Sequence, residues 1–300
     1  MLNVRRAGAG LEVETPAKIN VGLHLLGKRP DGYHELESLV MAVSLTDTLA
    51  AEATADGALA LAVRCAGADA PADDSNLVLR AARLLQSQGR VAAGARLTLT
   101  KRIPAARGLG GGSSDAAAAL LLLDRLWQSG LGVPQLSALG AQLGSDVPFF
   151  LNGPLAIMRG RGERLEPIAS KVNVWVVLVL PAFGLATRDV YQRAKVPLTT
   201  SAGAATLDWS LLVQGHVGKL GKHLRNDLEP AAQSLNPEML RLRGLLELTG
   251  AKCVSMTGSG SALYALAATA DDARSIADAL CRMGQGTDVR IVTPWFGRDS

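Results

Sequence analysis

Long apolar runs, paired cysteines and aromatic residues are scarce in this sequence of 300 residues. No stretch reaches the about 18 consecutive apolar residues that a membrane-spanning helix needs. The longest candidates, residues 116–123 and 172–180, have the length of buried elements. The cysteines, Cys65, Cys253 and Cys281, are isolated and odd in number, which matches neither a disulfide framework nor zinc-ligand spacing. We therefore expect buried free thiols and no membrane span.

Strong charge of one sign is missing as well. Lys and Arg number 31 against 27 Asp and Glu, and the net charge of +4 is spread along the chain without a basic run. This gives little support to nucleic-acid binding and is compatible with an anionic small substrate. Residues 1–6, Met-Leu-Asn-Val-Arg-Arg, contain neither the apolar segment nor the cleavage site of a secretory signal. We expect a cytoplasmic protein of one large or two ordinary domains, with no nucleic-acid or membrane partner.

Glycine, in contrast, is concentrated in one loop. Residues 104–115 read Pro-Ala-Ala-Arg-Gly-Leu-Gly-Gly-Gly-Ser-Ser-Asp and lead into an apolar helical run over 116–127. The glycines permit positive φ and remove the Cβ atoms that would keep a ligand away from the backbone. Ser113 or Ser114 can cap the helix, so that loop amides and the positive helix end face one bound anion. The loop predicts a polyphosphate site, with a simple strand-to-helix turn as the alternative.

Strand patterns precede this loop. Residues 11–25 alternate apolar with small or polar residues, which predicts a strand that places Lys18 and Asn20 on one face. On the strand pattern alone, a solvated lysine and a strand-end asparagine are the favoured explanation of these two residues. Further along, apolar segments over 39–63 are interrupted at Thr46-Asp47 and at Asp56-Gly57, which predicts separate strands.

Three other positions have both a structural and a functional interpretation. Asn76 stands at the start of a helix predicted over residues 77–86, where an asparagine can serve as a cap. Asp146 lies in a Gly-Ser-Asp-Val-Pro turn after a helix predicted over 133–143, and most aspartates in such turns are caps. Residues 256–262, Met-Thr-Gly-Ser-Gly-Ser-Ala, are typical of a hairpin turn between strands.

Taken together, these segments resemble the motifs of the GHMP kinases, the family of galactokinase, homoserine kinase, mevalonate kinase and phosphomevalonate kinase. The similar segments are Pro-Ala-Lys-Ile-Asn at 16–20, the glycine loop at 104–115 and the loop at 256–262. They occur in the family's order and cover nearly the whole chain. The resemblance implies an α+β fold of two lobes with the active site in the cleft between them. The N-terminal ATP-binding lobe, 1–166, would be of the ribosomal protein S5 domain 2-like type, and the C-terminal lobe, 167–300, ferredoxin-like.

The resemblance also implies a division of roles for phosphoryl transfer. Asp146 would accept the proton of the acceptor hydroxyl, and Lys18 would stabilise charge between Asp146 and the terminal phosphate. The cofactors would be ATP and Mg²⁺, with Ser114 as the residue whose hydroxyl reaches the metal. The residues expected to contact ATP are Asn76, Lys101, Pro104, Ala105, Ala106, Arg107, Gly108, Leu109, Gly110, Gly111, Gly112, Ser113 and Ser114.

For the acceptor, Asp31-Gly32-Tyr33-His34 resembles the branch of the family that phosphorylates the 2-hydroxyl of a cytidine diphosphate derivative of methylerythritol. By that resemblance, Tyr33 and Tyr191 would flank the cytosine and His34 would bind its edge. Core packing is the open alternative for Tyr191. The residues expected at the remainder of the substrate are Asn20, Thr187 and Ser259.

One departure from the family pattern stands at Ala106-Arg107, where small residues, often glycine, are usual. Arg107 either projects outward or adds a nucleotide contact. The competing functions are another small-molecule kinase of the family, for mevalonate, homoserine or a sugar, and a catalytically silent nucleotide-binding protein. Residues 31–34 argue against the first, and the presence of both Lys18 and Asp146 argues against the second. We expect a monomer or a weak homodimer.

Overall fold

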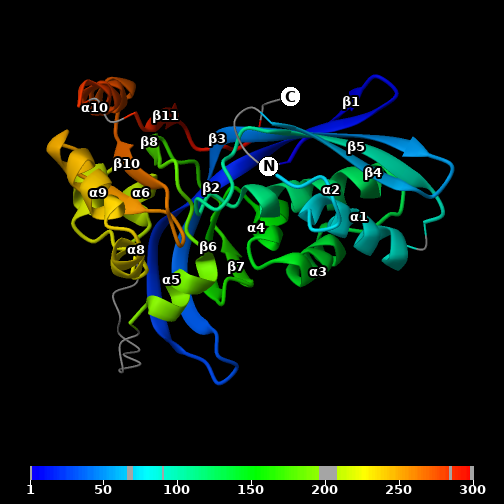
Figure 1. The fold of residues 1–300 in the computed structure, drawn as a ribbon, viewed down its shortest axis with the longest axis horizontal. Coiled ribbons are helices and arrows are strands. Elements are labelled where there is room, and N and C mark those ends of the chain that lie inside the picture. Colours follow the sequence, from blue (N-terminus) through cyan, green and yellow to red (C-terminus); the bar gives the residue numbers. More distant parts are fainter. Residues whose placement is uncertain (1, 66–69, 90, 196–207, 284–285, 298–300) are drawn as a thin grey trace.

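Two long antiparallel strands organise the first half of the chain in the computed structural model (Figure 1). The structure describes residues 2–65, 70–89, 91–195, 208–283 and 286–297. These two strands belong to a sheet of seven, in which β1-β2-β3-β5-β4 form the main path and β6 pairs with both β3 and β7. The strands are β1 (Val4–Ala7), β2 (Gly10–Lys28), β3 (His34–Thr54), β4 (Leu59–Cys65), β5 (Gly94–Lys101), β6 (Leu155–Gly160) and β7 (Arg164–Pro167).

The strand predicted over residues 11–25 is confirmed as the middle of β2. The interruption predicted at Thr46-Asp47 is wrong, because β3 runs through both residues. Asp47 is fully buried within the strand, where its carboxylate accepts a hydrogen bond from the backbone N–H of Ile103 at 2.9 Å and contacts the Lys101 ammonium. A charged residue with such partners can continue a strand that its polarity alone would end.

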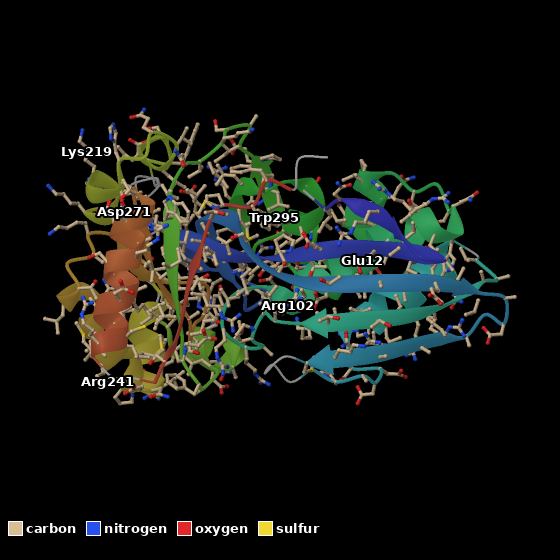
Figure 2. All side chains as sticks on the ribbon, turned by 90° about the horizontal axis from the view of Figure 1, so that it is seen from above. Glu12, Arg102, Lys219, Arg241, Asp271 and Trp295 are labelled. Carbon is tan, nitrogen blue, oxygen red and sulfur yellow. The ribbon has the colours of Figure 1, made fainter. Side chains whose placement is uncertain are left out.

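Helices cover one face of this sheet (Figure 1), and Figure 2, in which Glu12 and Arg102 are labelled, looks onto the opposite face. α2 contacts both β2 and β3 and lies between them and its neighbours α1 and α3. The alanine- and leucine-rich run that begins at Ala116 is almost entirely buried, as expected for a helix enclosed in a domain. The helices are α1 (Leu77–Gln88), α2 (Gly111–Trp127), α3 (Val133–Leu143) and α4 (Val147–Asn152).

The C-terminal lobe is built on a second, antiparallel sheet with the order β11-β8-β10-β9. Its strands are β8 (Trp175–Leu180), β9 (Val254–Met256), β10 (Leu263–Ala267) and β11 (Asp288–Val292). Its helices are α5 (Thr187–Arg193), α6 (Ser210–Val213), α7 (Val217–Gly221), α8 (Glu229–Leu235), α9 (Glu238–Leu248) and α10 (Ala270–Arg282). In Figure 1 most of these helices gather at the end of the molecule away from α1, whereas α5 lies near the β2–β3 turn. The expected α+β architecture of two lobes is confirmed.

The cysteine expectation is only partly correct. Cys253 is buried, whereas Cys65 and Cys281 are exposed. Cys65 ends the edge strand β4, and Cys281 lies off the buried face of α10, which Ala273, Ile276 and Leu280 form. Among the described residues, no helix combines the length and the hydropathy needed to cross a bilayer.

Candidate active site

A cavity of about 1200 Å³ lies where the two lobes meet. In the N-terminal lobe its lining comes from β2, the β2–β3 turn, the loop before α2 and the start of α4. In the C-terminal lobe the lining comes from α5 and the loop between β9 and β10. In the described part of the chain, every predicted site residue except Ser114 lines this one cavity. Residues as far apart in the sequence as Lys18 and Ser259 therefore share a single site.

The glycine loop is shaped as much by protein contacts as by the open cavity. Gly108 and Gly110 have φ of 72° and 69°, the left-handed conformation that glycine adopts without strain. A Cβ on Gly108 would lie 2.1 Å from the carbonyl oxygen of Thr257, and one on Gly110 would lie 3.0 Å from Cγ of Lys18. These glycines let the loop approach the β9–β10 loop on one side and β2 on the other.

The start of α2 differs from the expectation that Ser113 or Ser114 caps it. The helix begins at Gly111, its N-cap is Gly110, and no side chain of the described residues caps it. The expectation was wrong because Gly111 and Gly112 already have helical backbone, which places both serines inside the first turn. First-turn N–H groups have no acceptor within a helix and lie at the positive end of its dipole. This uncapped end opens on the cavity and suits an anion.

Ser114 must be corrected as a candidate metal ligand. Its side chain is fully buried, and its Oγ has no hydrogen-bond partner among the described residues. Ser113, one residue earlier, lines the cavity instead. Successive residues of a helix point about 100° apart, so a cavity next to Ser113 leaves Ser114 turned into the lobe.

Lys18 and Asp146 lie together at the mouth of the glycine loop. The Lys18 ammonium is 3.6 Å from Oδ2 of Asp146, and it donates a hydrogen bond of 2.5 Å to Oδ1 of Asn20. Strand β2 is joined to the loop by a backbone hydrogen bond of 2.9 Å from Lys18 to Leu109. The Lys18 side chain is 5% exposed and that of Asp146, just before α4, is 31% exposed. A buried cation and an accessible carboxylate thus face the same space.

Asn20 holds the Lys18 side chain through contacts that the sequence did not reveal. Its Nδ2 donates to the hydroxyl of Ser38 at 2.8 Å, and its backbone N–H donates to the hydroxyl of Thr257 at 3.0 Å. The Tyr264 hydroxyl donates to the Asn20 carbonyl oxygen at 3.0 Å. The amide is therefore oriented with its oxygen towards Lys18.

Lys101 lines the cavity, yet its ammonium is engaged by two buried carboxylates, those of Asp47 and of Asp115, the latter at 2.7 Å. Burial lowers the pKa of Lys101, but the two carboxylates outweigh this effect and raise it above its ordinary value. Burial raises the pKa of Asp115 to about 6 against the opposing effect of Lys101. Thr15 donates a further hydrogen bond of 2.7 Å to Asp115. This cluster ties β2, β3 and β5 to the N-terminal part of α2, beneath the glycine loop.

Asn76 caps α1, as one of its two interpretations proposed. Its Oδ1 accepts a hydrogen bond of 2.9 Å from the backbone N–H of Val78, and its Nδ2 donates to the carbonyl oxygen of Pro71 at 2.6 Å. Although Asn76 lines the cavity, both polar groups of its side chain are paired within the protein.

Aromatic rings gather at the other end of the cavity. The rings of His34 and Tyr191 are 5.4 Å apart, and the Arg161 guanidinium lies 5.1 Å from the centre of the Tyr33 ring. Tyr33 is 54% exposed, whereas Tyr191 packs against the core and also lines the cavity, so core packing is confirmed for Tyr191 and its contact with the substrate stays a prediction. Burial, and secondarily the carboxylate of Asp146, raises the pKa of the Tyr191 hydroxyl. Arg161 was not predicted as a site residue, although its place between Gly160 and Gly162 marks a turn that can carry an exposed cation.

A hydroxyl pair within the C-terminal lobe and a guanidinium group that joins the two lobes complete the site. The hydroxyls of Thr187 on α5 and of Ser259 in the β9–β10 loop are 3.0 Å apart and line the cavity. Arg107 donates hydrogen bonds to the carbonyl oxygens of Pro181 and Ala182 at 2.9 and 2.8 Å. Its side chain therefore reaches the C-terminal lobe.

Sequence comparisons show which proteins the chain is similar to. Residues 76–154 match the GHMP kinases N terminal domain, and residues 210–286 match the GHMP kinases C terminal family. The chain is 44% identical over 261 residues to the 4-diphosphocytidyl-2-C-methyl-D-erythritol kinase of Pelotomaculum thermopropionicum, which covers 87% of this chain and 90% of that protein. It is 39% identical over 264 residues to the kinase of the same name from Brevibacillus brevis, covering 85% of this chain and 87% of that protein.

The fold of the chain is also similar to those of solved kinase structures. A crystal structure of 4-(cytidine 5'-diphospho)-2C-methyl-D-erythritol kinase superposes with a TM-score of 0.74 at 36% identity, covering 94% of this chain and 98% of that one. Homoserine kinase from Cytophaga hutchinsonii has the same TM-score of 0.74 at 20% identity, covering 98% of each chain, which is a likeness of fold alone. The family matches, the identities and the shared fold together show that the chain belongs to the GHMP kinase family.

Proposed function

We propose that this chain transfers the terminal phosphoryl group of ATP to the 2-hydroxyl of 4-diphosphocytidyl-2-C-methyl-D-erythritol, giving ADP and the 2-phosphate. It is an ATP-dependent kinase of isoprenoid precursor biosynthesis by the non-mevalonate pathway. The observation that carries the proposal is the convergence of Lys18, Asp146 and the uncapped start of α2 on one cavity. The matches to the two relatives named above cover most of this chain and most of each relative. They support the choice of acceptor.

In this proposal Asp146 accepts the proton of the acceptor hydroxyl as its oxygen attacks the terminal phosphorus. The bond between that phosphorus and the bridging oxygen of ADP breaks, and ADP leaves. The Lys18 ammonium, 3.6 Å from the carboxylate, stabilises the negative charge on the transferring group. Because Lys18 is almost fully buried, its charge acts with little screening by water.

The residues present suit the triphosphate of ATP. The glycine loop presents backbone rather than side chains to the cavity, and the first turn of α2 offers N–H groups that no side chain of the described residues occupies. A Cβ on Gly112 would meet its nearest neighbour, Leu77, only at 3.6 Å, so this part of the loop borders open space. We assign the phosphates to residues 108–113. Lys101 supports the loop from below in this assignment, because Asp47 and Asp115 already pair with its charge.

Mg²⁺ fits as a companion of the nucleotide. No group of three or more His, Cys, Asp and Glu side chains that could hold a metal occurs among the described residues. The phosphates would therefore supply most of its ligands, with the Ser113 hydroxyl and the Asp146 carboxylate as the protein groups nearest the loop that line the cavity. When bound, the metal ion neutralises charge on the phosphates.

At the other end of the cavity, the acceptor's cytosine would lie against Tyr33 and Tyr191, with His34 at its edge. Stacking of a base on an aromatic ring contributes about 1–3 kcal/mol. Burial and the nearby Lys28 lower the pKa of His34, so its ring stays neutral at pH 7 and can both donate and accept a hydrogen bond. Asn20, Thr187 and Ser259 line the same cavity, and we assign the erythritol portion and its phosphates to them.

A coupled assay of ADP release tests the proposal with purified protein. We expect turnover with 4-diphosphocytidyl-2-C-methyl-D-erythritol and none above background with mevalonate, homoserine or galactose. Turnover with one of these three but not with the cytidine substrate would replace the proposed acceptor. Binding of ATP without turnover on any of the four would indicate a silent nucleotide-binding protein.

A further inference from the structure

We propose that Arg107 is a positioning residue that couples nucleotide binding in the glycine loop to acceptor binding at α5. This inference rests on the proposed function, because it assigns the two ends of the cavity to ATP and to the cytidine substrate.

The Arg107 side chain leaves the glycine loop and binds the segment that follows β8. Its Nε donates to the Pro181 carbonyl oxygen at 2.9 Å, and one terminal nitrogen donates to that of Ala182 at 2.8 Å. The other terminal nitrogen donates to the carbonyl oxygen of Ala105 at 3.0 Å, within the loop itself. The planar guanidinium thus uses all three of its nitrogens to join two backbones.

The next residues of that segment also contact the glycine loop. The Leu185 N–H donates to the Ala106 carbonyl oxygen at 3.4 Å. A Cβ on Gly184 would lie 2.6 Å from a terminal nitrogen of Arg107 and 3.0 Å from Cβ of Ala106, so only glycine leaves room for the guanidinium here. The residue at 184 and the residue at 107 therefore fit each other.

The contacts continue into the acceptor end of the cavity. The Ser261 hydroxyl donates to the Phe183 carbonyl oxygen, and the Ala262 N–H donates to the Arg107 carbonyl oxygen at 3.2 Å. α5 begins directly afterwards at Thr187 and carries Tyr191 into the cavity beside His34. The loop that would hold the phosphates and the helix that would hold the base are therefore joined through one six-residue segment, 181–186.

A shared segment predicts positive coupling. When one ligand orders residues 181–186, the second ligand no longer bears that entropic cost and binds more tightly. Without Arg107 each ligand keeps its own direct contacts with the protein. However, a ligand bound at the glycine loop then no longer orders residues 181–186 for the ligand at α5. The expected loss is therefore in the coupling between the two ligands, which a general loss of stability would not change selectively.

Titration calorimetry of the full chain measures this coupling. The dissociation constant of the β,γ-imido analogue of ATP with Mg²⁺ is determined with and without saturating CDP, in the wild type and in variants. We expect CDP to tighten binding of the analogue by roughly fivefold or more in the wild type. In Arg107→Ala the ratio should fall to about one, while the dissociation constant of CDP alone changes by less than about threefold. Gly184→Ala, which displaces the guanidinium, should reproduce this loss.

Arg102→Ala is the matched control, because Arg102 is an exposed arginine five positions earlier that does not belong to the segment. It should keep the wild-type ratio. If Arg107→Ala folds poorly, Arg107→Lys retains the charge without the planar fork and should also lower the ratio. Equal ratios in the wild type and the Arg107 variants, or an equal loss in Arg102→Ala, would overturn the inference. A wild type that turns over the cytidine substrate without coupling overturns only this inference, whereas one that binds no CDP overturns the proposed function.

Discussion

Replacing Lys18 by methionine removes an ammonium group and keeps a side chain of similar length. That group lies 3.6 Å from Asp146 and 2.5 Å from Asn20 in a setting where the side chain is 5% exposed. Charge-stabilising groups in phosphoryl transfer are worth about 10³ to 10⁵ in rate. This range equals about 4 to 7 kcal/mol of activation free energy. We therefore expect Lys18→Met to lower kcat by at least about 10³-fold.

The measurement is steady-state release of ADP, with thermal unfolding as the control for folding. The variant leaves Oδ1 of Asn20 without its donor, which costs about 1–3 kcal/mol of stability and should leave the protein folded at 25 °C. The KM for the cytidine substrate should change by less than about threefold, because Tyr33 and His34 are unaffected. A folded variant with a kcat within tenfold of the wild type would refute the role of Lys18.

The other predictions concern the cluster beneath the loop and the aromatic end of the cavity. Lys101→Met should lower the free energy of unfolding by about 3–5 kcal/mol, because it leaves the carboxylates of Asp47 and Asp115 buried without their cation. Asp115→Asn should gain stability relative to the wild type as pH rises. In the folded protein the pKa of Asp115 is about 6, above its usual 3.8. The free energy of unfolding of the wild type therefore falls by up to ~3 kcal/mol as pH rises from 3.8 to 6, whereas that of the variant does not. Tyr33→Ala should raise the KM for the cytidine substrate by roughly 5- to 100-fold with little change in the KM for ATP.

Urea unfolding at pH 4, 5.5 and 7 tests the first two of these, and initial-rate kinetics test the third. A Lys101→Met variant of wild-type stability would contradict the structural role of Lys101. For Asp115→Asn, a stability difference that stays constant across this pH range would contradict the raised pKa. An unchanged KM for the cytidine substrate would remove Tyr33 from the platform.

Local sequence patterns predicted those elements of the fold whose structure depends mainly on neighbouring residues. The alternation in β2, the apolar run of α2 and the glycine loop each depend on neighbouring residues, and each was recognised. The order of the motifs then identified the residues that share the cavity. Lys18 and Asp146 could be paired from the resemblance alone, although they are 128 positions apart in the sequence.

The remaining features depend on partners far away in the sequence. Asp47 reads as a strand breaker until Lys101 and Ile103 are placed beside it. Arg107 left two alternatives open because its acceptors, at Pro181 and Ala182, lie more than 70 residues later. Ser113 and Ser114 are equivalent in the sequence, and only the helix start at Gly111 shows which one faces the cavity.

The central claim is that Asp146 takes part in the chemical step at the end of the glycine loop. A rapid-quench experiment follows a single turnover of ATP by Asp146→Asn in the presence of the cytidine substrate, next to calorimetric binding of the ATP analogue. The account predicts binding of the analogue within about threefold of the wild type and a chemical step slower by about 10²- to 10⁴-fold. A chemical step as fast as that of the wild type would contradict it.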